Sequence, residues 1–217
     1  ALSDYVVMRK GAVMAVSSVK LTSMAISEST QPEDLGGWRM HTDVTGMADL
    51  AVDTDEEALD AIRRFLSYLP SHHAAAPPAR AHDASLDPDG RAIRRLLPLE
   101  RTKVYDMRRV LECVFDRGSM LELKGRYAKN IVTALARVEG GVVGIVANNP
   151  LHKGGAIDAP ACEKATSFMV LCDSFNVPLL FLVDQPGFLI GIEGERQGAV
   201  GRVMNWMNAL SLVTVPK

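Results

Sequence analysis

The chain contains 217 residues, of which 47% are hydrophobic and 23% are charged, and its formal net charge at pH 7 is −2. This composition is typical of a globular protein, and the near balance of charge argues against nucleic acid or an anionic membrane surface as a partner. No apolar run reaches the roughly 18 residues that a membrane-spanning helix needs, and the first residues carry no secretory signal.

The potential metal ligands do not predict a metal site. The cysteines, Cys113, Cys162 and Cys172, are odd in number and lack metal-binding spacing, which predicts buried free thiols in a reducing compartment. The adjacent His72 and His73 have no third ligand at a suitable spacing, so we expect solvated linker histidines there.

Residues 1–69 are predicted to form a first compact region. Residues 6–16 are apolar and β-branched enough for a pair of strands, with a turn at Lys10 and Gly11. Residues 33–49 are rich in glycine and polar side chains and are expected to be loop.

A helix is predicted to begin after Thr54. Thr54 as N-cap and Glu57 three residues later form a capping box. Apolar residues then recur at helical spacing until Pro70 ends the pattern. They are Leu59, Ile62, Phe65, Leu66 and Leu69.

Residues 70–103 are predicted to be a linker. They include Pro77-Pro78 and the segment Asp87-Pro88-Asp89-Gly90, and their apolar content is low. This combination favours a linker over an element of a packed core.

Residues 104–217 alternate strands and helices. Asp106 is a candidate N-cap for a helix through Phe115. Strands are predicted over residues 120–123, 131–138, 142–146 and 178–184, and helices over residues 161–175 and 197–212. Gly140 and Gly141 are the predicted hairpin turn between the second and third strands. The buried side of the first of these helices is predicted to hold Ala165, Phe168, Met169 and Cys172. The alternation predicts an α/β fold with a largely parallel sheet.

The end of the last strand is the candidate ligand site. Residues 178–191 read PLLFLVDQPGFLIG, an apolar run that stops at Asp184 and continues into a Pro-Gly turn. Ligands of α/β proteins bind outside the carboxyl ends of strands. A Pro-Gly pair after a strand is also often only a turn, and the sequence pattern leaves both readings open.

Several segments together resemble one family, the carboxyltransferase (β) subunits of biotin-dependent acyl-CoA carboxylases, which include the propionyl-CoA and methylcrotonyl-CoA carboxylases. The segments are residues 34–37 (DLGG), 41–42 (HT), 45–46 (TG), 48–49 (AD), 127–131 (YAKNI), 142–150 (VVGIVANNP), 154–158 (GGAID), 171–178 (LCDSFNVP), 178–191 and 213–217 (VTVPK).

The resemblance implies the crotonase-like (ClpP/crotonase) superfold in parts of two similar halves. Residues 1–69 would be the C-terminal part of the first, acyl-CoA-side domain, and residues 104–217 the N-terminal part of the second, biotin-side domain. Family members are more than twice as long, so the chain looks like an internal piece of such a subunit.

The implied activity is carboxyl transfer from carboxybiotin to the α-carbon of a short or branched acyl-CoA. In this chemistry the biotin supplies its own base, and the protein supplies backbone N–H groups for developing oxyanions. The lack of an acid–base constellation is consistent with this, because His41 and His152 stand alone and are expected to be structural.

The resemblance also implies roles for individual residues. Gly187 and Phe188 would provide an oxyanion-hole N–H. Pro186, Leu189, Ile190 and Gly191 would line the biotin or acyl pocket, and Gly36, Gly37 and His41 would border the acyl-CoA site. Gly154-Gly155-Ala156 lacks nucleotide-binding spacing, and we interpret it as a tight turn that packs the following helix.

The family further implies biotin carboxylase and biotin carboxyl carrier partners, a homo-oligomer that is usually a hexamer, and a bacterial cytoplasmic or mitochondrial matrix location. Gln185 and Ile190 replace residues common in the family, so the identity of the acyl group stays open.

The glycine segments that complete both oxyanion holes lie outside Ala1 and Lys217 in the family, so this piece alone is expected to be inactive. Two alternatives are a biotin-dependent acyl-CoA decarboxylase and a non-catalytic scaffold.

Overall fold

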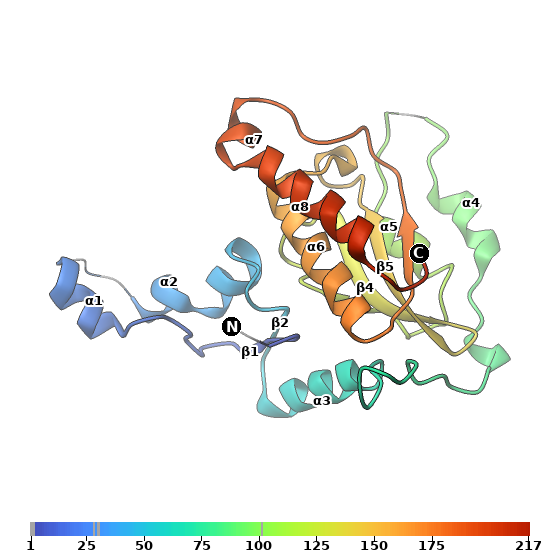
Figure 1. The fold of residues 1–217 in the computed structure, drawn as a ribbon, viewed down its shortest axis with the longest axis horizontal. Helices are drawn as coiled ribbons and strands as arrows, with labels where there is room; N and C mark the ends of the chain where they lie inside the picture. Colours follow the sequence, from blue (N-terminus) through green and yellow to red (C-terminus); the bar gives the residue numbers. More distant parts are fainter. Residues whose placement is uncertain (1–2, 28, 30, 101) are drawn as a thin grey trace. The chain divides into compact units, whose positions relative to one another are not determined.

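The structure is a computed structural model, and it describes residues 3–27, 29, 31–100 and 102–217 (Figure 1). The chain divides into two compact units. The first contains Ala1–Leu66 together with Lys124–Tyr127, and the second contains Ser67–Leu123 and Ala128–Lys217.

The first unit is built around two short parallel strands, β1 (Val7–Arg9) and β2 (Leu50–Val52). The predicted turn at Lys10 and Gly11 is present, but the predicted strand pair within residues 6–16 is wrong. The partner of β1 comes instead from β2, more than 40 residues later, because both strands bury one residue in the same small core.

Helices occupy much of the rest of this unit. They are α1 (Val19–Ile26), α2 (Pro32–Gly36), the π-helix η1 (Met40–Val44) and α3 (Asp55–Leu66). The prediction of loop over residues 33–49 is therefore wrong, since α2 and η1 fall within it. Pro32 at the first position of α2 and the acidic Glu33 and Asp34 after it are helix-start signals that explain α2.

Helix α3 has the predicted capping box. The Glu57 N–H donates to Thr54 Oγ1 at 3.2 Å, and the Thr54 N–H donates to Glu57 Oε2 at 3.4 Å. The helix ends at Leu66, three residues before the predicted end. Phe65 is buried and stacks on Tyr5, whereas Leu59, Ile62 and Leu66 are exposed.

The predicted linker has no strand within its described residues but contains three short helices, η2 (Ala84–Leu86), η3 (Gly90–Ala92) and α4 (Ile93–Leu96). It is part of the second unit and is hydrogen-bonded to later residues of that unit. The buried Arg137 guanidinium donates to the Pro78 carbonyl at 2.8 Å, and Asn176 Nδ2 donates to the Ala75 carbonyl at 2.9 Å.

The second unit contains a four-stranded sheet in the order β3 (Leu121–Leu123), β4 (Ile131–Val138), β5 (Gly141–Asn148) and β6 (Leu179–Leu182). The β3–β4 and β4–β5 pairs are antiparallel, and only β5–β6 is parallel. The expectation of a largely parallel sheet is therefore wrong for these strands, because a two-residue hairpin forces antiparallel neighbours.

That hairpin turn lies one residue earlier than predicted. Val138 pairs with Gly141, so the turn residues are Glu139 and Gly140. Both have positive φ, 48° and 82°, as a type I′ turn requires.

The strands are preceded by α5 (Met107–Leu111), interrupted after β5 by η4 (Lys153–Gly155) and α6 (Ala159–Ser174), and followed by α7 (Ile192–Arg196) and α8 (Ala199–Leu212). Asp106 caps α5 as predicted, although the helix ends at Leu111 and continues as turns toward Phe115. The predicted buried side of α6 is confirmed at all four positions, and α6 lies beside α8 (Figure 1). Cys162 and Cys172 are buried free thiols, but Cys113 is only partly buried.

One hydrophobic core of this unit lies between α5 and one face of the sheet. Met107, Val110 and Leu111 pack there against alternate residues of β4 and β5. This packing brings the start of α5 close to the carboxyl end of β5, where the candidate site lies.

Candidate functional site

The candidate site is at the carboxyl end of the parallel pair β5–β6. Ala147 pairs with Leu182, so both strands end at the same edge of the sheet. The loop after β5 and the turn after β6 therefore meet there, which is the usual location of ligands in α/β proteins.

Phe188 pairs with Ile157 across this edge. The Ile157 N–H donates to the Gly187 carbonyl at 3.0 Å, and the Leu189 N–H donates to the Ile157 carbonyl at 2.7 Å. In such a parallel bridge the central residue, Phe188, directs its own N–H toward the opposite side. The structure thus directs one backbone donor away from Ile157, as an oxyanion hole requires.

Gly187 has a backbone conformation that favours glycine. Its φ is +134°, and a Cβ added there would meet no atom within 4 Å. The glycine is therefore required by the backbone angles of the turn, and the space beside it is open to a ligand.

The predicted pocket residues continue from this turn. Phe188 is 41% exposed and Ile190 is 89% exposed, and Leu189, Pro186 and Gly191 are also exposed. The segment presents apolar side chains to its surroundings next to the free space at Gly187. An apolar ligand group would bury these side chains.

Gly155 packs closely against the backbone at the start of the turn. Its φ is +77°, and a Cβ there would lie 2.6 Å from the Asp184 main-chain oxygen. Asn148 Nδ2 donates to the Gly155 carbonyl at 3.1 Å. The predicted tight turn at Gly154 and Gly155 is present, but the close contact of Gly155 is with the backbone at Asp184 and not with the following helix.

Asp158, the residue that follows Ile157, fixes the loop at the start of α6. It is 5% exposed, caps α6 by accepting from the Ala161 N–H at 3.0 Å, and is ion-paired with Lys153. Burial raises the pKa of Asp158, but the hydrogen bonds from Lys153, Ala161 and Asn130 outweigh it, and the pKa lies below its usual value. The carboxylate is therefore ionised and serves to hold the loop.

Tyr105 is a further residue of the site that the sequence does not predict. Its hydroxyl donates at 2.5 Å to Oδ2 of Asp184, which lies two residues before Pro186. Burial raises the pKa of Tyr105, and the hydrogen bond and charge of Asp184 raise it further. The two residues are 79 positions apart, and no sequence pattern pairs them.

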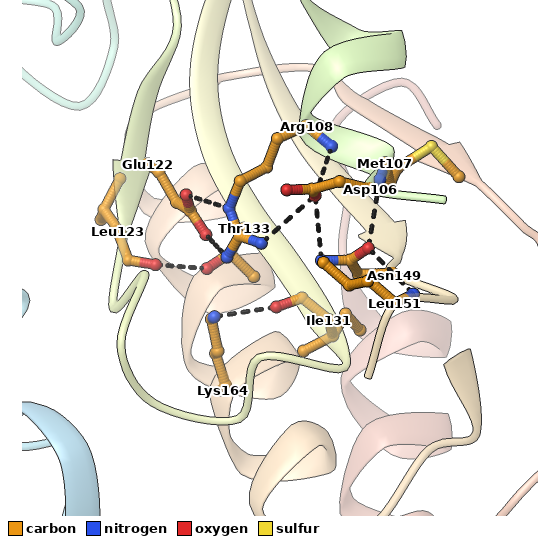
Figure 2. Close-up of polar contacts among 10 residues, drawn as sticks. All are labelled: Asp106, Met107, Arg108, Glu122, Leu123, Ile131, Thr133, Asn149, Leu151 and Lys164. Atoms are coloured by element: carbon orange, nitrogen blue, oxygen red, sulfur yellow. Dashed lines mark hydrogen bonds and ion pairs between the residues drawn. The ribbon is translucent and has the colours of Figure 1, made fainter. Parts of the chain in front are cut away.

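A polar network, drawn in Figure 2, holds the start of α5, and Tyr105 directly precedes the N-cap of this helix, Asp106, in the sequence. Asn149 Nδ2 donates to Asp106 Oδ1 at 3.2 Å, and the Met107 N–H donates to Asn149 Oδ1 at 3.1 Å. Arg108 makes a bidentate ion pair with Glu122, at 2.7 and 2.6 Å. These bonds connect α5 to β3 and to the end of β5.

The predicted acyl-CoA-side residues lie together in the first unit. A Cβ at Gly36 would lie 2.2 Å from the Met14 main-chain oxygen, and His41 Nε2 is 2.6 Å from the same oxygen. His41 Nδ1 is 3.1 Å from Thr45 Oγ1, and Gly37 forms an isolated bridge with Val13. Both ring nitrogens of His41 are thus engaged, which favours the structural role expected for this histidine.

Three cationic side chains surround Trp38 in the same unit. Lys10 Nζ, Arg39 Cζ and Arg126 Cζ lie 5.5, 4.6 and 5.2 Å from the centre of the Trp38 ring. Arg126 also forms a bidentate pair with Asp43, at 2.6 and 2.7 Å. This cluster was not recognised in the sequence, because its members are spread over more than 100 residues.

Two kinds of site do not occur among the described residues. Within those ranges, no three His, Cys, Asp or Glu side chains are grouped to hold a metal ion. No helix in the described part of the chain has the length and apolar character to cross a bilayer.

Comparison with known proteins extends over the whole chain. Residues 1–217 match the carboxyl transferase domain family. The chain is 39% identical to the carboxyltransferase subunit of propionyl-CoA carboxylase from Haloferax mediterranei and 36% identical to the methylmalonyl-CoA carboxyltransferase 12S subunit from Propionibacterium freudenreichii subsp. shermanii. All of this chain is covered in both cases, but only 42% and 41% of the relatives.

A solved structure agrees with these relatives. The crystal structure of transcarboxylase 12S, described as a hexamer with methylmalonyl-coenzyme A and methylmalonic acid bound, superposes with a TM-score of 0.93 at 36% identity. It covers 100% of this chain, which spans 42% of that one. The fold is thus the crotonase-like α/β superfold, and the chain belongs to the carboxyl transferase domain family.

Proposed function

We propose that the chain is part of the carboxyltransferase subunit of a biotin-dependent acyl-CoA carboxylase, which moves a carboxyl group from carboxybiotin to the α-carbon of a short or branched acyl-CoA. The observation that carries this proposal is the turn at Gly187 and Phe188 in a chain of this family, which directs the Phe188 N–H away from Ile157 and leaves open space beside Gly187. Biotin, carried on a partner, supplies the carboxyl group and the base.

The residues of the turn would have two roles. The Phe188 N–H would donate to the oxygen on which negative charge develops, and a fixed donor in a site shielded from water stabilises such charge strongly. The apolar side chains of Leu189 and Ile190, with Pro186 and Gly191, would line the biotin or acyl pocket and exclude water. Because biotin would supply the base, the residues of the turn would need to transfer no proton.

The first unit would bind the acyl-CoA. Gly36, Gly37 and His41 would border this site, and the cations around Trp38 offer positive charge and an aromatic face to a phosphate-bearing adenine nucleotide. In this proposal residues 1–69 belong to the first domain and residues 104–217 to the second domain. Residues 70–103 form the linker between the two domains.

The subunit would work as a homo-oligomer, a hexamer like the solved transcarboxylase 12S, with biotin carboxylase and biotin carboxyl carrier subunits as partners. Exposed apolar side chains on α8, among them Val200, Met204 and Met207, support a large subunit interface. Gly187 and Phe188 would then face a cleft formed with the first half of another subunit.

Two locations suit this enzyme, the bacterial cytoplasm and the mitochondrial matrix. The relatives include bacterial proteins and the mitochondrial propionyl-CoA carboxylase beta chain of Sus scrofa. The relatives' names favour a carboxylase over the decarboxylase and scaffold alternatives.

The test uses the full-length subunit with its biotinylated partner, ATP and bicarbonate. Propionyl-CoA, acetyl-CoA and methylcrotonyl-CoA are supplied separately, and carboxylated products are measured by mass spectrometry. Carboxylation of at least one of them is expected. Sodium-dependent decarboxylation without carboxylation would instead favour the decarboxylase, and a stable oligomer with neither activity would favour the scaffold.

A further inference from the structure

The direction of the Phe188 N–H depends on the short segment between the end of β6 and Phe188. Val183, Asp184 and Pro186 in this segment are exposed, so little of it is held by core packing. The contacts that hold it are the bridge to Ile157 at its far end and the contacts of Asp184 at its near end.

At the near end, Asp184 is held through both its backbone and its side chain. Its main-chain oxygen lies against Gly155, and its carboxylate accepts the Tyr105 hydroxyl at 2.5 Å. That distance is typical of a charge-assisted O–H···O⁻ bond, which is about twice as strong as a neutral one.

Tyr105 is itself rigidly placed. The next residue, Asp106, accepts from the Arg108 N–H at 3.1 Å and from Asn149 Nδ2 at 3.2 Å. Asn149 is fully buried, and its own N–H donates to the Asn130 carbonyl at 2.9 Å. The hydroxyl of Tyr105 is therefore carried on a support that is tied to the ends of β4 and β5.

We propose that Tyr105 and Asp184 are positioning residues for carboxyl transfer: their hydrogen bond holds the turn after β6 so that the Phe188 N–H points at the developing oxyanion. The inference rests on the proposed function. Neither side chain touches the reacting atoms in this account; both act through the backbone of the turn. Since burial and the Asp184 charge raise the pKa of Tyr105, its hydroxyl stays protonated as the donor at neutral pH.

Loss of a positioning residue lowers the rate of the reaction, whereas loss of a merely structural residue lowers the stability of the fold. The bond lies at the surface of the unit, so its removal should affect folding little. An oxyanion donor displaced by a fraction of an ångström, however, loses stabilisation of the transition state and not of the bound substrate. The loss should therefore fall on kcat and leave KM for acyl-CoA unchanged.

The experiment uses the full-length subunit in its oligomer with the biotinylated partner. Tyr105→Phe and Asp184→Ala should each lower kcat roughly tenfold, within the range for weakening one oxyanion donor. Asp184→Asn keeps an acceptor for the hydroxyl and should retain most of the activity. The double variant Tyr105→Phe/Asp184→Ala should be no slower than either single variant, because both remove the same bond.

A second measurement does not depend on activity. Hydrogen–deuterium exchange of a peptide covering residues 184–190 should become faster in Tyr105→Phe and Asp184→Ala and stay unchanged in Asp184→Asn. Tyr5→Phe is the matched control. It removes a buried hydroxyl that has no hydrogen-bond partner among the described residues, and it should change neither kcat nor this exchange.

Several results would overturn the inference. They are wild-type kcat in Tyr105→Phe, additive losses in the double variant, or unchanged exchange of residues 184–190 in both single variants. A loss of kcat that merely follows a lower melting temperature and a smaller CoA-binding fraction would also overturn it. If the wild-type complex carboxylates no acyl-CoA, the proposed function fails, and the exchange measurement still decides whether this bond holds the turn.

Discussion

Gly155 lies against the backbone of Asp184 so closely that a Cβ on the glycine would be 2.6 Å from the Asp184 main-chain oxygen. Together with the bridge between Ile157 and Phe188, the contact joins the loop after β5 to the turn after β6, two segments that helix α6 separates in the sequence. The geometry of the candidate site therefore depends on a residue outside the turn.

Gly155→Ala should destabilise the protein. The added methyl group would collide with main-chain atoms, and the positive φ of +77° adds strain, for a combined loss of roughly 2–4 kcal/mol in the free energy of unfolding. The matched control is Gly154→Ala, which has φ of +61° but open space around a Cβ, and should cost only about 1–2 kcal/mol. Chemical denaturation measures both, and equal losses would contradict the role of the contact.

Gly187→Val in the full-length subunit should leave the fold intact and lower carboxyl transfer at least about tenfold, or about 1.4 kcal/mol of transition-state stabilisation. A β-branched residue is strained at φ of +134°, and its methyl groups would occupy the open space beside the Phe188 N–H.

The Gly187 variant is tested by measuring steady-state carboxylation, CoA affinity and thermal unfolding. Its CoA affinity should change little. Gly11→Val is the control, because Gly11 also has positive φ and open surroundings but lies in the first unit. Unchanged turnover in Gly187→Val would mean that the turn is only structural, and a collapsed melt would mean that the variant tests folding.

Arg39→Gln should raise KM for acyl-CoA by roughly three- to tenfold without changing kcat, if the cations around Trp38 meet the CoA phosphates. The effect should shrink as salt is added, since exposed charges are screened. Kinetics at two ionic strengths measure it. Arg63→Gln on α3, where Arg63 pairs with Asp60, is the control and should leave KM unchanged at both.

The 217-residue chain expressed alone should show no carboxyltransferase activity. It spans 42% of the relatives, and both oxyanion holes would lack donors in this proposal, each missing donor costing about 100- to 1,000-fold in rate. Product formation from propionyl-CoA and free carboxybiotin measures this, with the full-length subunit in parallel. A rate near that of the full-length subunit would refute the prediction.

Local signals in the sequence correctly predicted the elements that depend on near neighbours. The capping box at Thr54 and Glu57, the N-cap at Asp106 and the buried side of α6 each involve residues within one or two helical turns. The sequence also predicts that a turn containing Gly187 and Phe188 follows a strand, because an apolar strand followed by Pro-Gly is a local pattern. The family resemblance, and not periodicity, suggested its role.

Only the tertiary structure decided which distant segments pair. The β1–β2 pairing and the Tyr105–Asp184 hydrogen bond join residues more than 40 positions apart. The mixed direction of the sheet depends on which strands become neighbours. The exposed face of α3 was likewise not evident, because helical spacing shows that apolar residues share a side but not what covers it. Helix caps and buried helix faces are determined by residues close together in the sequence, whereas contacts between distant residues arise only when the whole fold packs.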